Sequence, residues 1–188
     1  MGIGDVDDDG LADVAAAAKN APGGNWFAWW RQGTDGHWTK NLIAANQEGA
    51  SNIFVTDVNK DGKMDFFASR GHGKGVLWFE GPEWKVHEIE LAIQYPHSLA
   101  IGDVDGDGDI DAVACSAVYD KFPSNPTLAW FENDGKGKFR THRIGEDQAA
   151  YDVRLADMDK DGDLDILVAG QESRNVVWYE NRLRAISR

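Results

Sequence analysis

The sequence contains little of what several classes of protein require. Cys115 is the single cysteine among 188 residues, so a disulfide framework and a thiolate metal site are both excluded. Because it lies in an apolar stretch, we expect Cys115 to be a small buried strand residue. Lysine and arginine number 19 against 32 aspartates and glutamates, which gives a net charge of −13 without any basic stretch. We therefore expect no nucleic-acid partner.

Long hydrophobic runs are also missing. No stretch is apolar enough to span a membrane, and we identify no signal peptide, since the chain opens at Met1 directly before an acidic segment. The chain nevertheless contains 42% hydrophobic residues in 20.7 kDa. That is enough to bury a core, and it predicts one soluble unit spanning residues 1–188.

One acidic pattern, Asp-x-Asp/Asn-x-Asp-Gly-x-x-Asp, is abundant. It occurs four times, at residues 5–13, 57–65, 103–111 and 157–165, with starts 52, 46 and 54 residues apart. This spacing is the period of a repeat architecture rather than of scattered sites.

Alternating oxygen ligands on a turn that glycine permits are typical of Ca²⁺ sites. We expect side chains at positions one, three, five and nine of each loop, with the ninth bidentate, and the backbone carbonyl at position seven as ligands for up to four Ca²⁺. An EF-hand is excluded, because position twelve is alanine or valine in every copy. The candidate ligands are Asp5, Asp7, Asp9, Leu11, Asp13; Asp57, Asn59, Asp61, Lys63, Asp65; Asp103, Asp105, Asp107, Asp109, Asp111; and Asp157, Asp159, Asp161, Asp163, Asp165.

The expected role of the calcium is structural. The side-chain ligand positions hold 15 carboxylates, and four bound Ca²⁺ at two charges each change the net charge from −13 to −5. We expect the second loop to bind most weakly, because it has Asn59 in place of an aspartate and Lys60 and Lys63 alongside.

Three further columns come into register when the chain is aligned on these loops. Each loop is followed by a short apolar run, then by a Trp-aromatic pair (Trp-Trp at 29–30, Trp-Phe at 78–79 and 130–131, Trp-Tyr at 178–179), and three copies add an alternating segment. Leu11–Lys19 alone has helix propensity, but its counterparts indicate a strand. Four short strands per repeat predict an all-β fold, a β-propeller of four blades at residues 1–46, 47–94, 95–147 and 148–188.

The acidic loop between the first two strands, with a Trp-Phe-Glu-Asn type third strand, resembles the FG-GAP or VCBS repeat. That resemblance implies calcium-binding blades like those of integrin α-chain propellers and of many bacterial secreted proteins, and hence an extracellular or periplasmic location. Propellers of this family usually have seven or eight blades. The chain therefore corresponds to a four-bladed ring, a half ring or an excerpt, to be completed by a homodimer or by further blades.

Function is expected to be non-catalytic, with the propeller serving as a binding or adhesion scaffold for a protein or glycan. The alternatives are a lectin and the propeller portion of a carbohydrate-active enzyme, a polysaccharide lyase or dehydratase. Trp26 and Trp30 lie outside the main tryptophan column and are the better sugar-stacking candidates. His97 is expected in the central funnel, and His87 and His142 on the outer surface. The Pro-rich segment 119–126 is the first candidate for contact with a partner.

Overall fold

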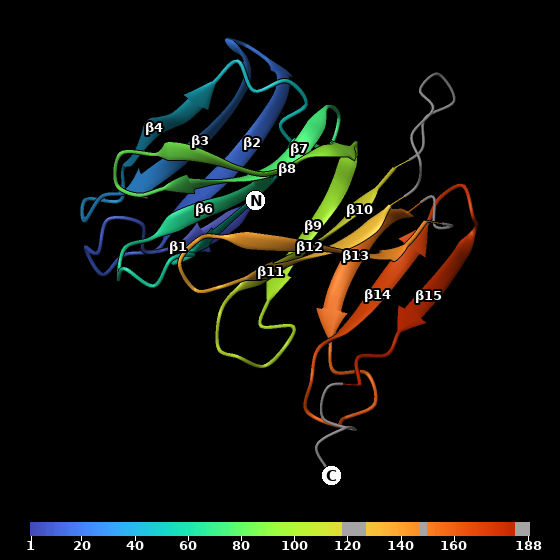
Figure 1. Ribbon diagram of the computed structural model, residues 1–188. Coiled ribbons are helices and arrows are strands. Elements are labelled where there is room, and N and C mark those ends of the chain that lie inside the picture. Colours follow the sequence, from blue (N-terminus) through green and yellow to red (C-terminus); the bar gives the residue numbers. More distant parts are fainter. Residues whose placement is uncertain (118–126, 147–149, 183–188) are drawn as a thin grey trace.

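The computed structural model describes residues 1–117, 127–146 and 150–182. All regular structure in this part is β-strand, arranged as four antiparallel sheets that follow one another along the chain (Figure 1). No helix of the described part is long and apolar enough to cross a membrane. The expected all-β, propeller-like fold is confirmed.

Each sheet is a meander whose strands pair in sequence order. The first two sheets contain β1 (Gly2–Gly4), β2 (Asp13–Ala21), β3 (Gly24–Gln32) and β4 (Trp38–Ala45), then β5 (Asn52–Thr56), β6 (Asp65–Ser69), β7 (Lys74–Glu80) and β8 (Lys85–Gln94). The last two contain β9 (Pro96–Gly102), β10 (Asp111–Ser116), β11 (Leu128–Asn133) and β12 (Phe139–Gly145), then β13 (Ala150–Ala156), β14 (Asp165–Gly170) and β15 (Asn175–Tyr179). A fourth strand of the last sheet, expected near 183–188, lies outside the described residues.

The alanine-rich segment after the first loop is a strand, although its composition favours a helix. Val14 pairs with Ile3 of β1 on one side and with Trp30 of β3 on the other, and Ala15 is fully buried. Hydrogen bonding on both edges and burial between sheets outweigh intrinsic helix propensity, which amounts to less than about 1 kcal/mol per residue.

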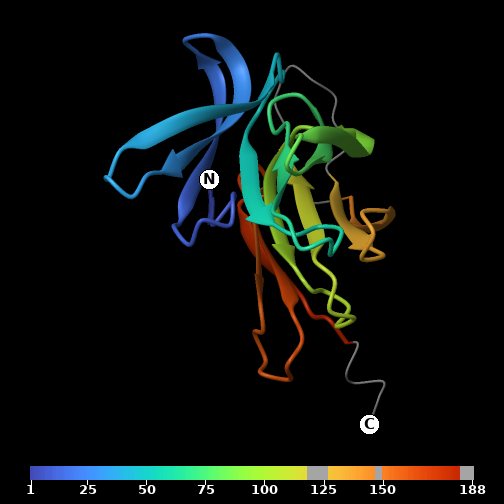
Figure 2. The same ribbon diagram turned by 90° about the vertical axis from the view of Figure 1, so that its left-hand side faces the viewer.

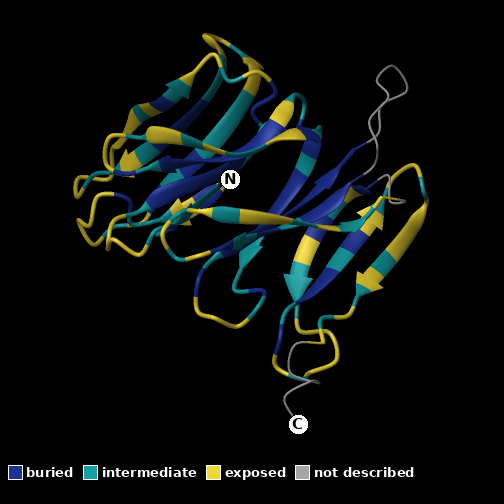
Figure 3. Cartoon of the chain, in the orientation of Figure 1, coloured by how far each residue is buried: buried dark blue, intermediate teal, exposed yellow. Residues whose placement is uncertain are grey.

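The core consists of three apolar clusters, each between two consecutive sheets. Aromatic side chains meet there, as where Phe27 of β3 lies 5.5 Å from Phe79 of β7 between ring centroids. Figure 3 shows the resulting pattern, with buried residues along the central strands and exposed residues at the loops. The packing of apolar side chains between consecutive sheets therefore holds the row of four sheets together.

The first strands of the sheets converge on one side of the molecule. Residues of β5, β9 and β13, together with Met1, line a concavity of about 750 Å³. Glycine is needed where these strands approach closely, since a Cβ on Gly2 would lie 2.9 Å from the backbone nitrogen of Val55. In the turned view of Figure 2, the first sheet (blue) and the fourth sheet (red) lie at different ends of the molecule.

Candidate functional site

All four acidic loops join the first strand of a sheet to the second and share one backbone conformation. The sixth-position glycine has a positive φ in each loop, as at Gly10 and Gly62 (both 85°). Position four is also left-handed throughout, with φ values of 58°, 57°, 77° and 66° at Asp8, Lys60, Gly106 and Lys160. Glycine adopts this region without strain at position six, whereas position four adopts it with Asp, Lys or Gly, so the glycine is the residue of the pattern that permits the turn.

The first aspartate of each loop holds the turn. Asp5 accepts hydrogen bonds from the backbone N–H groups of Asp9 (3.0 Å) and Gly10 (2.8 Å), and Asp57 accepts the equivalent pair. The fifth-position carboxylate accepts the N–H of position seven, as from Leu11 to Asp9 at 2.9 Å. These are the local Asx bonds expected of aspartate in a tight turn.

The ninth aspartate has a second role that the sequence did not reveal. Asp111 accepts the N–H of Val104 in its own loop (3.1 Å) and that of Asn133 at the end of β11 (2.8 Å), one bond on each oxygen. The same two bonds recur at the other ninth positions, and all four aspartates are fully buried: Asp13, Asp65, Asp111 and Asp165. The expected bidentate ligand is thus also a brace between loop and third strand.

Burial has an electrostatic cost at these positions. It raises the pKa of Asp65 and of Asp111 to about 6, because desolvation disfavours the charged carboxylate more than the two N–H groups favour it. A cation beside the loop would oppose this shift. The burial of a carboxylate at this corner therefore fits a metal site.

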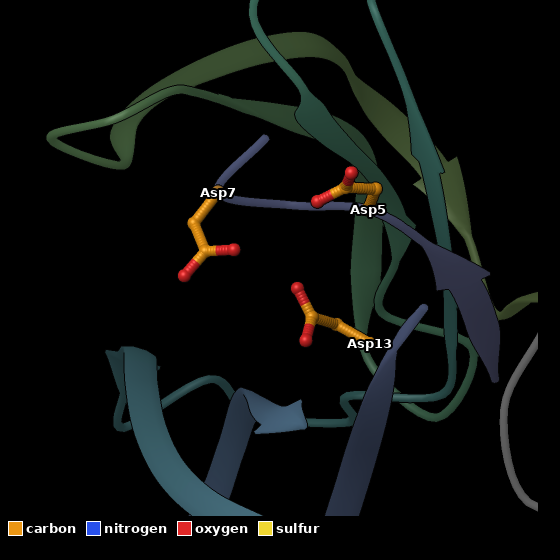
Figure 4. A group of neighbouring side chains, drawn as sticks. All are labelled: Asp5, Asp7 and Asp13. Carbon is orange, nitrogen blue, oxygen red and sulfur yellow. The ribbon is translucent and has the colours of Figure 1, made fainter. Parts of the chain in front are cut away.

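Three of the four loops gather carboxylates closely enough to share an ion. In the first loop, oxygens of Asp5, Asp7 and Asp13 lie within 4.8 Å of one another, and the three side chains point toward a common space in Figure 4. The third and fourth loops have clusters of the same size, formed by Asp103, Asp105 and Asp107 and by Asp157, Asp159 and Asp165. An all-oxygen donor set of this kind fits Ca²⁺.

The second loop brings no three carboxylates that close together, in a region that the structure describes completely. Asn59 occupies its third position, and its amide lies 3.5 Å from Glu80 of β7. The expectation that this loop binds most weakly stays a prediction.

Two basic side chains form ion pairs with aspartates of the acidic loops. The Arg31 guanidinium at the end of β3 forms ion pairs with Asp7 and Asp9, two proposed ligands of the first loop. We expected Lys60 to place its charge beside its own second loop. It instead forms an ion pair with Asp109 of the third loop. These carboxylates raise the pKa of Arg31, chiefly through the Asp9 hydrogen bond, and that of Lys60, chiefly through Asp109.

Asparagine side chains connect the loops of adjacent sheets. The Asn133 amide, buried at the end of β11, donates to the carbonyl of Val58 in the second loop (2.8 Å) and to that of Ile110 in the third (3.1 Å). Asn181 repeats this one sheet later with Val104 and Leu164 (2.7 and 3.2 Å). Glu-Asn follows the Trp-aromatic pair in the third and fourth repeats only, and that dipeptide was the sequence signal for these two sets of contacts.

Grooves run between the outer strands of consecutive sheets. At the second junction the groove is partly filled, because the His87 ring stacks on Trp78 with centroids 4.4 Å apart and bonds to Glu80 at 2.7 Å. His142, Trp130 and Glu132 repeat that arrangement. These two histidines are on the outer strands, as expected, but they are only partly exposed.

The groove between the first two sheets differs. Asn41 takes the position of the stacking histidine, and Arg31 that of the glutamate. This groove encloses about 670 Å³ and is lined by Trp84, Trp29, Asn41 and Lys40, with Asp5, Asp7 and Asp8 of the first loop at one end. Trp29 and Trp84 meet edge to face, with centroids 6.3 Å apart. An aromatic wall with polar groups around it is what a small polar ligand requires.

The remaining sequence candidates are dispersed. Trp26 and Trp30 lie together on the free face of the first sheet, with the Lys40 ammonium 3.6 Å above the Trp26 ring. His97 lines the central concavity, as expected, and its ring lies 3.9 Å from that of Tyr151. Cys115 is buried in β10. The Pro-rich segment 119–126 lies outside the described residues.

A family model described as FG-GAP-like repeat matches the chain three times, at residues 5–68, 57–114 and 103–168. Each match begins at an acidic loop and extends into the strand after the next loop. No curated protein matches the chain in sequence.

Among solved structures, the fold is similar to that of an Agrocybe aegerita lectin described as specifically recognising non-reducing terminal N-acetylglucosamine. The TM-score is 0.50 at 16% sequence identity, over 88% of this chain and 46% of the lectin chain. The chain thus spans less than half the length of that protein. At this identity the similarity shows the fold alone.

Proposed function

Because the chain belongs to the FG-GAP-like repeat family, we propose that it is a non-catalytic binding scaffold whose loops between the first two strands of each sheet hold structural Ca²⁺. The observation that carries this proposal is the convergence of three carboxylates in three of the loops, on one shared backbone conformation. Carboxylates that converge in this way repel one another, and a divalent cation held by their oxygens would offset that repulsion.

The residues of each loop have distinct tasks in this proposal. The first aspartate orders the turn and the ninth fixes the loop to the third strand. In the three clustered loops, positions one and three project carboxylate oxygens toward the same space, joined by position nine in the first and fourth loops and by position five in the third. A bound Ca²⁺ would supply the positive charge that offsets repulsion among them. Binding only to the folded form stabilises it by about 2.7 kcal/mol for each site at a concentration 100 times the Kd.

Calcium removal tests this role. For a chain of this size, one such site is worth roughly 5–10 °C in melting temperature, so excess chelator should lower the melting midpoint by at least that amount and readdition of Ca²⁺ should restore it. The buried Cys115 thiol, whose pKa burial raises to about 12, provides a second readout. It should resist a thiol reagent in calcium and react sooner in chelator on warming. An unchanged melting midpoint in excess chelator would refute the structural role.

We further propose that the scaffold binds a glycan in the groove between the first two sheets. The specific observation is that this junction lacks the histidine lid of the next two junctions, which leaves Trp84 and the edge of Trp29 beside Asn41 and Lys40. A partly exposed indole stacks on the apolar face of a sugar ring, while the Asn41 amide and the Asp8 carboxylate are placed to bond its hydroxyls. The similar lectin fold, described with N-acetylglucosamine, supports this choice of ligand class.

Filling the groove tests the glycan site. Asn41→His installs the residue that stacks on tryptophan in the next two sheets, and Trp84→Ala removes the aromatic wall. Both variants should lose binding at least tenfold on a glycan array and in titrations with N-acetylglucosamine oligomers. Trp38→Ala, at an exposed tryptophan outside the groove lining, should bind as wild type. Equal binding by all three variants would contradict this site.

We also propose an extracellular or periplasmic location. FG-GAP repeats are typical of extracellular proteins, and extracellular calcium modules work with Kd values of about 10⁻⁴ to 10⁻³ M. Calcium titration followed by melting temperature should therefore reach saturation only near millimolar Ca²⁺. Saturation at submicromolar Ca²⁺ would contradict this assignment.

A further inference from the structure

The sheets at the two ends of the row expose faces that the interior sheets bury. On the fourth sheet, Val176 is 69% exposed and Trp178 45% exposed, on the face that also carries Leu167. On the first sheet, Ile3 is 62% exposed and Leu42 55% exposed. In Figure 3, exposed residues cover much of β15 at one end of the molecule. Each end sheet therefore exposes large apolar side chains together on one face, beside Lys40 on the first sheet and Asp152 and Arg154 on the fourth.

These two faces are the two halves of the junction that the molecule already makes three times. In each interior junction, the tryptophan of one sheet's third strand faces the following sheet, where Trp29 is 7% and Trp78 2% exposed. The aromatic residue after it faces the preceding sheet, where Phe79 and Phe131 are fully buried. Trp178 is the corresponding tryptophan of the fourth sheet, and no sheet follows it among the described residues.

Trp30 is the counterpart of Phe79 and Phe131 on the first sheet, and no sheet precedes it in the described structure. It pairs across the strands with Val14 and Lys40, and Val14 pairs with Ile3, so these side chains share the free face of the first sheet. Leu42 pairs with Ala28 on the same face. The fourth sheet therefore offers what a following sheet needs, and the first sheet offers what a preceding sheet needs.

We propose that a second copy of this chain covers both faces, head to tail. The fourth sheet of one copy packs on the first sheet of the other at two equivalent junctions, and the two copies form a ring of eight sheets. The occupant follows from continuity with the three existing junctions, because the chain itself carries both complementary surfaces. Heterologous contacts of this kind either close a ring or grow into a filament, and four sheets in each copy allow closure by two.

This inference does not rest on the calcium or glycan proposals, since the apolar columns alone carry it. Charge opposes it, because two chains of −13 repel each other. At 150 mM salt the Debye length is about 8 Å, so most of this repulsion is screened.

Sedimentation equilibrium of the whole chain, in 150 mM salt with Ca²⁺, tests the ring. The expected result is a concentration-dependent equilibrium between 20.7 kDa and twice that mass. Val176→Glu on the fourth sheet and Ile3→Glu on the first should each raise the dimer dissociation constant at least tenfold, because every dimer contains both junctions. Both residues are exposed in the single chain, so its folding and melting should change little.

Leu91→Glu is the matched control, since Leu91 is 51% exposed on the outer strand of an interior sheet. It should leave the dissociation constant unchanged. A wild-type chain that stays at 20.7 kDa up to about 100 μM, or that forms open-ended assemblies, would overturn the proposal. So would an effect of Leu91→Glu as large as that of Val176→Glu. Loss of dimer with Val176→Glu but not with Ile3→Glu would show like faces pairing, which also contradicts the head-to-tail ring.

Discussion

The carboxylates of the acidic loops divide by what their oxygens contact. The ninth aspartates are buried and accept backbone N–H groups on both oxygens, whereas the third and fifth positions are nearer solvent and bond within the turn. The first group therefore stabilises the fold even without a metal, and the second group matters mainly when a cation is bound.

Substitution in metal-free buffer separates these roles. Asp111→Ala leaves two buried N–H groups without an acceptor and should cost about 2–4 kcal/mol of unfolding free energy. Asp105→Ala removes one of several repelling charges and should change stability by less than about 0.5 kcal/mol. Urea denaturation with chelator measures both. Equal losses for the two variants would show that the ninth position has no separate role.

The raised pKa of Asp65 and Asp111, about 6 against 3.8, gives metal-free protein a pH dependence of known sign. The folded state binds these protons more tightly than the unfolded state, so stability from these groups falls as pH rises from about 4 to 6. Melting in stripped, metal-free buffer should show this slope, and Asp65→Asn should reduce it. An unaltered slope in Asp65→Asn would assign the effect to other groups.

Arg31 changes the expected order of the calcium sites. Its guanidinium already pairs with Asp7 and Asp9, so a metal must compete with it in the first loop. We expect Arg31→Gln to raise the calcium affinity of this loop several-fold, as measured by isothermal titration calorimetry. Arg143→Gln, which removes an exposed pair with Glu146, should leave all sites unchanged. No gain in Arg31→Gln would mean that the ion pair yields to calcium without cost.

At the scale of the element, loops and strands are joined across sheets. In the third and fourth sheets, one asparagine at the end of the third strand makes both contacts. Its backbone N–H donates to the ninth aspartate of its own loop, and its side-chain amide donates to the loop of the preceding sheet. This places consecutive loops in fixed relation along one edge of the molecule. The strand meander, the loop and the junction therefore behave as one repeating unit.

Asn133 provides the test at this scale. Asn133→Ala leaves the buried carbonyl groups of Val58 and Ile110 without this donor, and we expect a loss of about 1–3 kcal/mol with or without Ca²⁺. Hydrogen exchange should increase in both the second and third loops. Asn41→Ala is a matched change at an asparagine whose amide bonds only locally, and it should leave stability nearly unaltered. Exchange that increases in the third loop alone would contradict a link between the sheets.

At the scale of the whole molecule, charge dominates. The net charge of −13 is concentrated in loops along the sheet edges, and four Ca²⁺ would reduce it to −5. The metal-free form should therefore gain more from screening than the calcium form.

Salt dependence measures this difference. Raising NaCl from 0.05 to 0.5 M should increase the melting temperature markedly in chelator and much less in saturating Ca²⁺. Potassium sulfate is not a suitable substitute, because sulfate strengthens apolar burial in both forms. Equal salt effects in the two forms would argue against electrostatic stabilisation by calcium.

The sequence by itself determined the repeat, the all-β fold and the turn. These depend on local properties, such as Gly62 in its left-handed conformation and the alternation of apolar residues, and each occurs four times. Because every copy repeats the pattern, the counterparts of Leu11–Lys19 outweighed its own helix propensity.

Tertiary structure alone decided which residues meet between repeats. Arg31 and Asp9 are 22 residues apart, and Asn133 and Val58 are 75 apart. The pairing of Lys60 with the third loop, the open groove beside Asn41 and the free faces at Trp30 and Trp178 likewise depend on how sheets pack. Sheet-on-sheet packing is set by side chains distant in sequence, and periodicity within one repeat carries no record of their approach.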